Sequence, residues 1–458
     1  MKKSLLVLLL LSGCKGGYKA PDVALNNEFL SQEATLDEKK FNPFFWEALE
    51  DPTLNQLVKL VEEKNYNLLS AYEKIKELRA QYRFQNSKFF PQFSGAGDIN
   101  RIKETQTLTY SRFLGQTLQT TYALGFDTIW ELDFFGVQQQ VKRSAFFTMM
   151  SQVEQVAYTK LSLVSELVLQ YSNLRTFQNL IDLYKKELKV LKEIEDLTSI
   201  QFTAGLQDQT TTLTDLARVQ DKQALLDRTQ ADVDRVIFLV TQLTGQFPDK
   251  EYDKLTKYVP LKSDIPLIYA DIPSKIVLSR PDVCVARFNL FSAQANLKKA
   301  YRDFFPQFNI TSNYGVLSNF ANLLFKKQSI NWNIMPGFNV TLIDFGALVA
   351  EKNVAKSKEK QALYAYENSL IGAFAEIETA LFGVQASDRQ IESLQEELLS
   401  LQEKTADIYE QFRIGLISKT NYLESYLEEL LIEESLVNAI NDRMGFTISF
   451  YKALGIRL

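Results

Sequence analysis

The chain has 458 residues without a single histidine, and it contains two cysteines. Without histidine it cannot use imidazole as a general acid or base, build a Ser-His-Asp triad or hold a metal ion through imidazole. The sequence also has neither a glycine-rich phosphate loop nor an acidic cluster away from helical faces. We therefore expect no enzyme activity, no cofactor and no metal site.

An excess of basic charge is also lacking. The chain has 51 Lys and Arg residues against 56 Asp and Glu residues, and its formal net charge is −5. Binding of nucleic acid requires a basic face. A nucleic-acid partner is therefore not expected.

The apolar run near the N-terminus is too short to span a bilayer. It covers residues 5–11, follows Lys2 and Lys3, and precedes Ser-Gly and Cys14, which is the pattern of a cleaved secretory signal. Residues 11–14 further resemble a lipobox, in which the cysteine is acylated. We expect a signal peptide over residues 1–13 and a lipid on Cys14; the alternative is an ordinary signal peptide that contains a cysteine. Cys284 would then pack as a small apolar side chain in a helix.

What the chain does contain is an internal duplication. The pentapeptide Phe-Phe-Pro-Gln-Phe occurs at 89–93 and again at 304–308. Other signals recur in the same order about 210 residues later. The dipeptide Asp133-Phe134 recurs as Asp344-Phe345, and Gly245 recurs as Gly455. We expect two tandem repeats, 53–245 and 274–458, after a lipidated N-terminal segment (14–52). The proline-rich stretch 246–273 links them.

Within each repeat the hydrophobic period changes in the same order. Period 3.6 predicts a helix over 53–88, and period two then predicts strands. The predicted strands are 93–99, 121–132, 308–316 and 332–342, and Pro336 in the last one indicates an edge strand or a bulge. Long helices without Gly or Pro follow over 138–204 and 347–414, and shorter return helices cover 209–244 and 419–453. A helix of that longer length measures roughly 100 Å.

The turn between each long helix and its return helix contains glycine. Gly205 and Gly415 tolerate the positive φ that a tight reversal needs. Leu206 and Leu416 beside them would be exposed apolar side chains unless a partner covers them. A long helix is matched in length by two short helices placed end to end, so we expect coiled-coil packing along its whole length.

Four predicted strands per chain are too few to close a barrel. An open sheet edge in lipid leaves backbone groups unpaired, so strands must be pooled between chains, and three chains give twelve strands with room for an aqueous lumen. The fold class expected is mainly α with a small transmembrane β part. The alternative is a set of soluble hairpins on a plain coiled coil.

Several stretches resemble a known family. Residues 45–54 (FWEALEDPTL), followed by 65–68 (NYNL) and 89–91 (FFP), resemble the opening helix of the TolC-like outer-membrane factors. Residues 280–283 (RPDV) and the FFP at 304–306 resemble the second-repeat signature of the same family, in particular the lipoprotein branch of multidrug (RND-type) efflux systems. The resemblance covers nearly all of the mature chain.

The resemblance implies a homotrimer with a twelve-stranded barrel in the outer membrane of a Gram-negative bacterium and an α-helical barrel in the periplasm. Its tip is implied to dock to a periplasmic adaptor (membrane fusion) protein linked to an inner-membrane pump. The chain would be a passive exit duct for drugs or other small toxic compounds, anchored by a lipid such as palmitate. Lys15 favours the outer membrane, because many lipoproteins retained at the inner membrane carry aspartate at that position.

The family's tips resemble Gly-x-x-Ser/Thr-x-x-Asp. Gly415, Ser418 and Asn421 fit this pattern with asparagine in the acidic place, whereas the first repeat, Gly205 with Asp and Thr at 208 and 211, departs at two positions. Asn421 is one gate candidate. Glu424, one helical turn further, is the other, and a solvated helix face is its alternative role.

The remaining site candidates lie where helices meet strands. Pro91 and Pro306 are expected at the rim of the barrel that faces the inner membrane, with Asp133 and Asp344 at the start of the long helices. Two other functions stay open at this point. One is the outer-membrane duct of a type I protein secretion system, and the other is a lipid-anchored periplasmic scaffold without a pore.

Overall fold

The computed structural model of the chain describes residues 18, 20–21, 44–103, 105, 118–250, 252–258 and 274–457. The predicted signal peptide and Cys14 lie outside these residues, as does most of the linker. The chain divides into two compact units. Unit 1 comprises Met1–Asp22, Lys74–Gln152 and Val285–Tyr366, and unit 2 comprises Val23–Glu73, Val153–Cys284 and Glu367–Leu458. Each unit draws on both sequence repeats.

The two repeats have the same order of elements, as the duplication predicts. The helices are α2 (Pro52–Lys64), α3 (Tyr66–Ser87), α5 (Val137–Thr203) and α6 (Gln209–Leu243) in the first repeat, and α8 (Pro281–Arg302), α9 (Ala347–Arg413) and α10 (Lys419–Leu454) in the second. The strands are β1 (Gln92–Lys103), β2 (Leu118–Leu132), β3 (Gln307–Ser318) and β4 (Ile330–Asn339). None of the described helices is both long and apolar enough to cross a bilayer.

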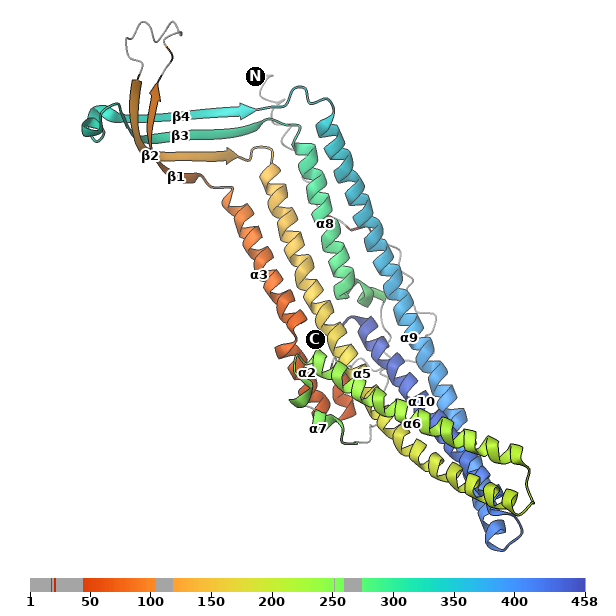
Figure 1. Cartoon of the computed structure of the whole chain (residues 1–458). Coiled ribbons are helices and arrows are strands. Elements are labelled where there is room, and N and C mark those ends of the chain that lie inside the picture. The colour runs from red at the N-terminus through yellow and green to blue at the C-terminus, as the bar shows by residue number, and fades with distance from the viewer. Residues whose placement is uncertain are drawn as a thin grey trace. The chain divides into compact units, whose positions relative to one another are not determined.

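The sheet belongs to unit 1 and has the order β1-β2-β3-β4, with every neighbouring pair antiparallel (Figure 1). The two hairpins join through β2 and β3, where Gly125 faces Gly315 so closely that a Cβ on Gly125 would lie 2.9 Å from the Cα of Gly315. β1 and β4 are the two edges. Pro336 lies on β4, which is an edge strand within the sheet of one chain and so one of the two positions, edge or bulge, that the sequence indicates for this proline.

The sheet has almost no core of its own. Every residue of β1 and of β4 is exposed. Large apolar side chains on all four strands are more than half exposed, namely Phe93, Phe126, Tyr314, Trp332 and Phe338. So many exposed large apolar side chains on one sheet indicate contact with membrane or with further protein.

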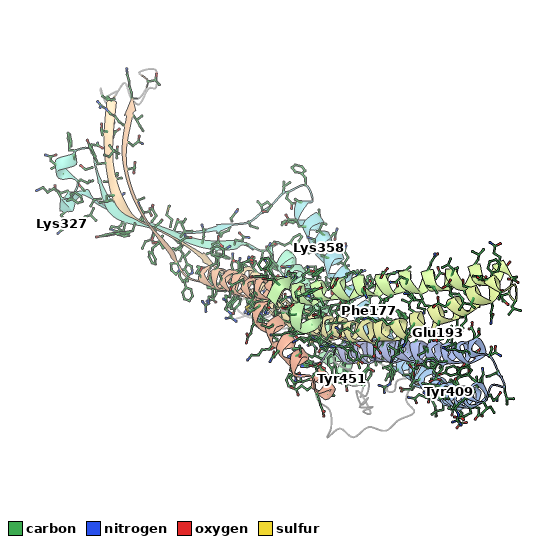
Figure 2. The ribbon with its side chains drawn as sticks, turned by 60° about the horizontal axis from the view of Figure 1, so that its bottom comes forward. Phe177, Glu193, Lys327, Lys358, Tyr409 and Tyr451 are labelled. Carbon is green, nitrogen blue, oxygen red and sulfur yellow. The ribbon has the colours of Figure 1, made fainter. Side chains whose placement is uncertain are left out.

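Unit 2 is a helical bundle. Within it α6 runs back along the second part of α5, and α10 runs back along α9 (Figure 1). Its core contains leucine, valine and isoleucine side chains from α5, α6 and α10, among them Leu188, Ile194, Leu226 and Leu430. Phe177 on α5 packs against this cluster (Figure 2). The 3.6-residue period therefore fixes the buried faces as expected.

The predicted helix over 53–88 is wrong in one respect, because the structure divides it into α2 and α3 at Asn65. Asn65 has an extended backbone (φ −66°, ψ 115°), and its side-chain oxygen accepts from the Leu68 amide at 3.0 Å. Its amide nitrogen also donates to the Leu243 carbonyl at 2.8 Å, near the end of α6. Asparagine competes for backbone groups in this way, and apolar periodicity does not register it.

Candidate functional site

The long helices begin where the hairpins end, and an aspartate stands at each of these starts. The carboxylate of Asp133 accepts from the Gln138 and Gln139 amides at 3.0 and 2.8 Å. Gly136 precedes α5 with a φ of +76°, and its carbonyl accepts from the Arg302 guanidinium at 2.7 Å. Asp133 therefore satisfies free N–H groups at the start of α5, while Arg302 ties the end of α8 to the same turn.

Asp344 has the same role at α9. Its carboxylate accepts from the Leu348 and Gly346 amides at 2.6 and 3.0 Å. These backbone hydrogen bonds, the one from Leu348 foremost, hold the pKa of Asp344 below its ordinary value. The recurrence of Asp-Phe in the sequence is therefore a recurrence of a helix cap.

The two prolines stand between a helix and a strand. Pro91 separates the end of α3 from β1, and Pro306 separates α8 from β3. Beside Pro91, the Trp130 indole N–H donates to the Phe89 carbonyl at 3.0 Å. Beside Pro306, Phe305 stacks on Phe135 with ring centroids 4.8 Å apart. Each Phe-Phe-Pro-Gln-Phe copy thus follows the end of a helix. The first copy contacts β2, and the second contacts the turn between β2 and α5.

The two helix reversals have the same backbone geometry. Gly205 and Gly415 have φ values of +73° and +80°. The amides of Leu206 and Leu416 bond back to the carbonyls of Gln201 and Gln411 at 2.8 and 2.9 Å. This is a Schellman-type helix end, which requires a left-handed residue. A Cβ at either glycine would meet nothing within 4 Å, so the backbone conformation and not space selects glycine.

The returning helices are capped alike, although their sequences differ. The side chain of Ser418 accepts from the Asn421 amide at 3.2 Å, and that of Asp208 accepts from the Thr211 amide at 2.7 Å. The turn at Gly205 departs from the family pattern in sequence, but Asp208 still caps the helix that follows it, as Ser418 does at the turn of Gly415. Asn421 itself is exposed, and its backbone amide serves the cap.

We expect Ser418→Ala to weaken the start of α10 by about 1 kcal/mol.

The Asp208 cap should also depend on pH. The Thr211 backbone N–H holds the pKa of Asp208 below its ordinary value, so this cap contributes above the pKa of the unfolded state and is lost as the pH falls through the folded value. Hydrogen exchange should therefore accelerate at Thr211 on acidification, after correction for intrinsic rates. The Ser418 cap does not titrate, so equal acceleration at Asn421 would contradict this account.

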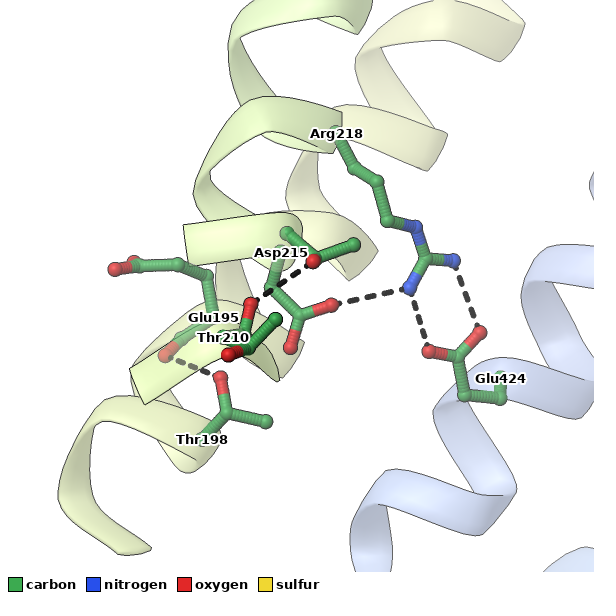
Figure 3. Close-up of polar contacts among 7 residues, drawn as sticks. Glu195, Thr198, Thr210, Asp215, Arg218 and Glu424 are labelled. Atoms are coloured by element: carbon green, nitrogen blue, oxygen red, sulfur yellow. Dashed lines mark hydrogen bonds and ion pairs between the residues drawn. The ribbon is translucent and has the colours of Figure 1, made fainter. Parts of the chain in front are cut away.

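Glu424 joins two helices of unit 2. The guanidinium of Arg218 on α6 donates to both carboxylate oxygens of Glu424 on α10, at 2.7 and 3.0 Å (Figure 3). Arg218 also contacts Asp215, one turn earlier on α6, at 3.2 Å. The hydrogen bond to Glu424, foremost, raises the pKa of Arg218. Glu424 is thus a paired carboxylate, a role that the sequence interpretation did not include.

Further ion pairs join the same helices. Lys222 on α6 contacts Glu187 on α5 and, at 3.4 Å, Glu434 on α10. The Tyr184 hydroxyl donates to Glu434 at 2.9 Å. Glu187 is fully buried, and desolvation raises its pKa. Because Lys222 contacts carboxylates from two other helices, α5, α6 and α10 are linked at this level of the bundle.

A third link lies nearer the turns. Lys419, the first residue of α10, pairs with Glu193 on α5, which Figure 2 labels. Beside it, the rings of Phe412 and Tyr422 stack with centroids 5.9 Å apart. Sequence reasoning missed these cross-helix contacts. The spacing of Asp215 and Arg218 could have signalled an i,i+3 pair, but nothing in the sequence joins either residue to a helix 206 positions away.

The apolar tips are exposed as expected. Leu206 and Leu416 are 78% and 71% exposed, and Ile200 and Ile414 beside the same turns are each 66% exposed. Within the described residues, no group of three or more acidic or thiol side chains could hold a metal ion. Both turns therefore present large apolar side chains to solvent.

The chain thus combines long helices that reverse at glycine with a four-stranded sheet whose two edge strands are exposed along their whole length. Comparison with known families gives the particular family. Residues 57–246 and 272–455 match the outer membrane efflux protein family, and the chain belongs to it. It is a channel component of an outer-membrane efflux system, and its family is one of transport channels and not of enzymes.

The relatives cover the whole chain. The antibiotic efflux pump outer membrane protein ArpC of Pseudomonas putida is 26% identical over 99% of this chain and 96% of its own length. The cation efflux system protein CusC of Escherichia coli K12 is 24% identical over 98% and 97%. Among solved structures, the outer-membrane channel OprN has a TM-score of 0.85 at 23% identity over 96% of this chain and 98% of its own. The Campylobacter jejuni channel CmeC has a TM-score of 0.85 at 22% identity, over 96% and 94%. The expected fold class is confirmed.

Proposed function

We propose that three copies of this chain pool their sheets into one twelve-stranded barrel and continue it as a helical tunnel in the periplasm. The observation that carries this is the sheet itself, which has two unpaired edges, β1 and β4, and exposed residues along both. Pairing β1 of one copy with β4 of the next removes every edge. Pro91, Pro306, Asp133 and Asp344 would then line the rim where strands leave the membrane.

The proposed cargo is small toxic compounds, driven by an inner-membrane pump that a periplasmic adaptor connects to the tips. Relatives carry names of antibiotic, toluene and cation efflux proteins, so the test uses compounds of several classes. A deletion strain should become more sensitive to some of a panel of dyes, detergents, antibiotics, solvents and metal salts. An unchanged panel together with loss of a secreted protein would favour a protein secretion duct instead.

We also propose that Cys14 is acylated and anchors the mature chain to the outer membrane. Its support is the signal pattern before it. Cells fed a labelled palmitate should incorporate label into the wild-type chain and not into Cys14→Ser. Label retained in Cys14→Ser would remove this proposal without touching the duct.

The tips are the proposed docking surface for the adaptor. We expect Leu416→Glu to abolish export, because a charge in an apolar contact must be desolvated on docking. Assembly should be unaffected, since Leu416 is 71% exposed and lies outside the core cluster of unit 2. Leu206→Glu tests the same contact at the other turn, and Gly415→Pro tests the turn geometry. Both variants should also lose export. Drug resistance of the mutant strain and co-purification of the adaptor are the measurements.

A matched control lies in the loop between β3 and β4. Phe325 is 76% exposed, and Phe325→Glu introduces the same charge at another exposed apolar position. It should leave resistance at the wild-type level. Full resistance in Leu416→Glu and Leu206→Glu strains would rule out docking through these leucines.

Arg218 and Glu424 are the proposed gate contact of each subunit. Their bond holds α10 against α6 close to the turns, where the helices would narrow the tunnel. Opening requires α10 to move away from α6 and therefore requires this pair to separate. Asn421 and Ser418 lie beside the gate as parts of the α10 cap.

A further inference from the structure

Tyr18, in the N-terminal segment, packs against α5 and α8 within unit 1. The Tyr18 hydroxyl donates to the side-chain oxygen of Gln140 on α5. Its ring meets Phe147 on α5 edge-on, with centroids 5.0 Å apart, and lies 6.4 Å from the ring of Phe291 on α8. The ammonium of Lys298, also on α8, stands 4.0 Å from the centre of the Tyr18 ring. Tyr18 therefore contacts two helices that come from different repeats.

The surroundings of Tyr18 form a receptor of aromatic rings and cations. Phe147 and Phe291 are themselves in contact, with centroids 5.4 Å apart, and Phe288 lies 6.2 Å from Phe291. A second cation, the guanidinium of Arg143, stands 5.6 Å from the Tyr18 ring. Aromatic edges and two cations around one ring favour an electron-rich aromatic side chain at this place.

Gln140 makes this contact specific for tyrosine. Its side chain is fully buried, and its amide nitrogen finds no hydrogen-bond partner in the described part of the chain. The amide oxygen is satisfied by the Tyr18 hydroxyl. A buried amide that lost this bond would have neither of its polar atoms paired among the described residues, which is unfavourable. Phenylalanine in place of Tyr18 would therefore fit the rings but not the glutamine.

The contacts lie close to where the helices meet the strands. Gln140 is three residues into α5 and Lys298 is four residues before the end of α8, distances of about 5–6 Å along each helix. Cys14 precedes Tyr18 by four residues, so an extended chain between them spans at most about 14 Å. That length reaches the level at which β2 ends and β3 begins, and little further.

We propose that Tyr18 is the docking residue of the N-terminal segment. It fixes this segment to the strand-proximal ends of α5 and α8, so that an acyl group on Cys14 enters the membrane beside the strands of its own chain. The placement of the lipid rests on the proposed acylation of Cys14, whereas the docking of Tyr18 does not. Docking ties the anchor to the part of the chain that must be held at the membrane while its strands pair.

Docking can be tested directly by photo-cross-linking in cells. With p-benzoylphenylalanine at position 18 of the full-length chain, ultraviolet light should link the mature N-terminal peptide to peptides of α5 around Phe147 and of α8 around Phe291. Tyr364, which is 62% exposed on α9, is the matched control position. The probe there should not capture the N-terminal peptide. Cross-links from position 18 that map outside α5 and α8, or none above the control, would overturn the proposal.

A second experiment separates docking of the anchor from a merely structural role. We expect Tyr18→Ala to reduce the heat-resistant assembled protein in outer membranes about threefold, Tyr18→Phe to reduce it by less, and Tyr364→Ala to leave it unchanged. In a Cys14→Ser background, Tyr18→Ala should cause no further loss, because both changes interrupt one function. Full, independent loss in the double variant would show that Tyr18 acts apart from the anchor. Absence of palmitate label in the wild type would refute acylation alone, since the cross-links would still report docking.

Discussion

Replacement of Arg280 by alanine should destabilise unit 2 by about 3 kcal/mol and reduce assembled protein more than any other single change considered for this chain. Arg280 is 2% exposed and sits where three elements meet. Its guanidinium pairs with Asp282, at 2.8 and 3.1 Å, and with Glu376 on α9, at 2.6 Å. It also donates to the carbonyl of Ala453, in the last turn of α10.

The physical reason is that one side chain makes hydrogen bonds to three helices, α8, α9 and α10. The carbonyls at the end of α10 have no partner within their own helix, and a cation there also interacts favourably with the helix dipole. The stem of Arg280 is packed as well, since a Cβ on Gly455 would lie 2.5 Å from its Cγ. Asp282 and Glu376 are 27% and 60% exposed, so water can solvate them once the arginine is gone. Most of the loss therefore comes from the buried end of α10.

Loss of helical circular dichroism on heating is the measurement, with the purified protein in detergent. Arg280→Ala should lower the transition by on the order of 5 °C. The transition temperature of Arg280→Lys should lie between those of Arg280→Ala and the wild type, because an ammonium cannot reproduce the guanidinium's fork of donors. Arg235 provides the control: it is 65% exposed in an i,i+3 pair with Asp232, and its alanine variant should match the wild type. Equal transitions for Arg280→Ala and Arg235→Ala would refute the role given to Arg280.

The predictable part of this molecule is what repeats along the chain. The duplication, the helix and strand periods and the glycine turns predict the order of elements and the reversals at Gly205 and Gly415. Each of these depends on backbone geometry that a residue and its neighbours determine locally. The boundaries of the long and return helices then differ from prediction by a residue or so.

The unpredicted part depends on side chains that meet from distant positions. Asn65 interrupts a strongly periodic helix because its side chain bonds to Leu68 and Leu243 instead. Glu424 reads in the sequence as either a gate acid or a solvated face, and the structure pairs it with Arg218. Tyr18 lies in a segment without periodicity, and its receptor is assembled from two repeats. Pairings across more than a hundred residues leave no local pattern in one sequence.

Separating Arg218 from Glu424 should open the channel. Each pair is about a third exposed, so it is worth only about 0.5–1 kcal/mol after solvent screening. In the proposed trimer, three symmetric pairs released together would contribute about 1.5–3 kcal/mol, which shifts the ratio of open to closed channels by roughly 10- to 150-fold. We therefore expect Arg218→Ala and Glu424→Ala to raise conductance in planar bilayers and to admit large antibiotics that the wild-type cell excludes.

The neighbouring contacts decide which variants are informative. Exchange of the two charges should restore closure only in part, because a glutamate at 218 would face Asp215, whose side chain is 8% exposed, at the distance now held by an ion pair. Arg218→Lys keeps the charge but loses the bidentate contact, so its conductance should be intermediate. Lys404 and Glu428 form the control pair, since their 2.6 Å contact joins α9 to α10 and not α6 to α10. If Lys404→Ala opened the channel as far as Arg218→Ala, general loosening of the tip and not the α6–α10 contact would control the gate.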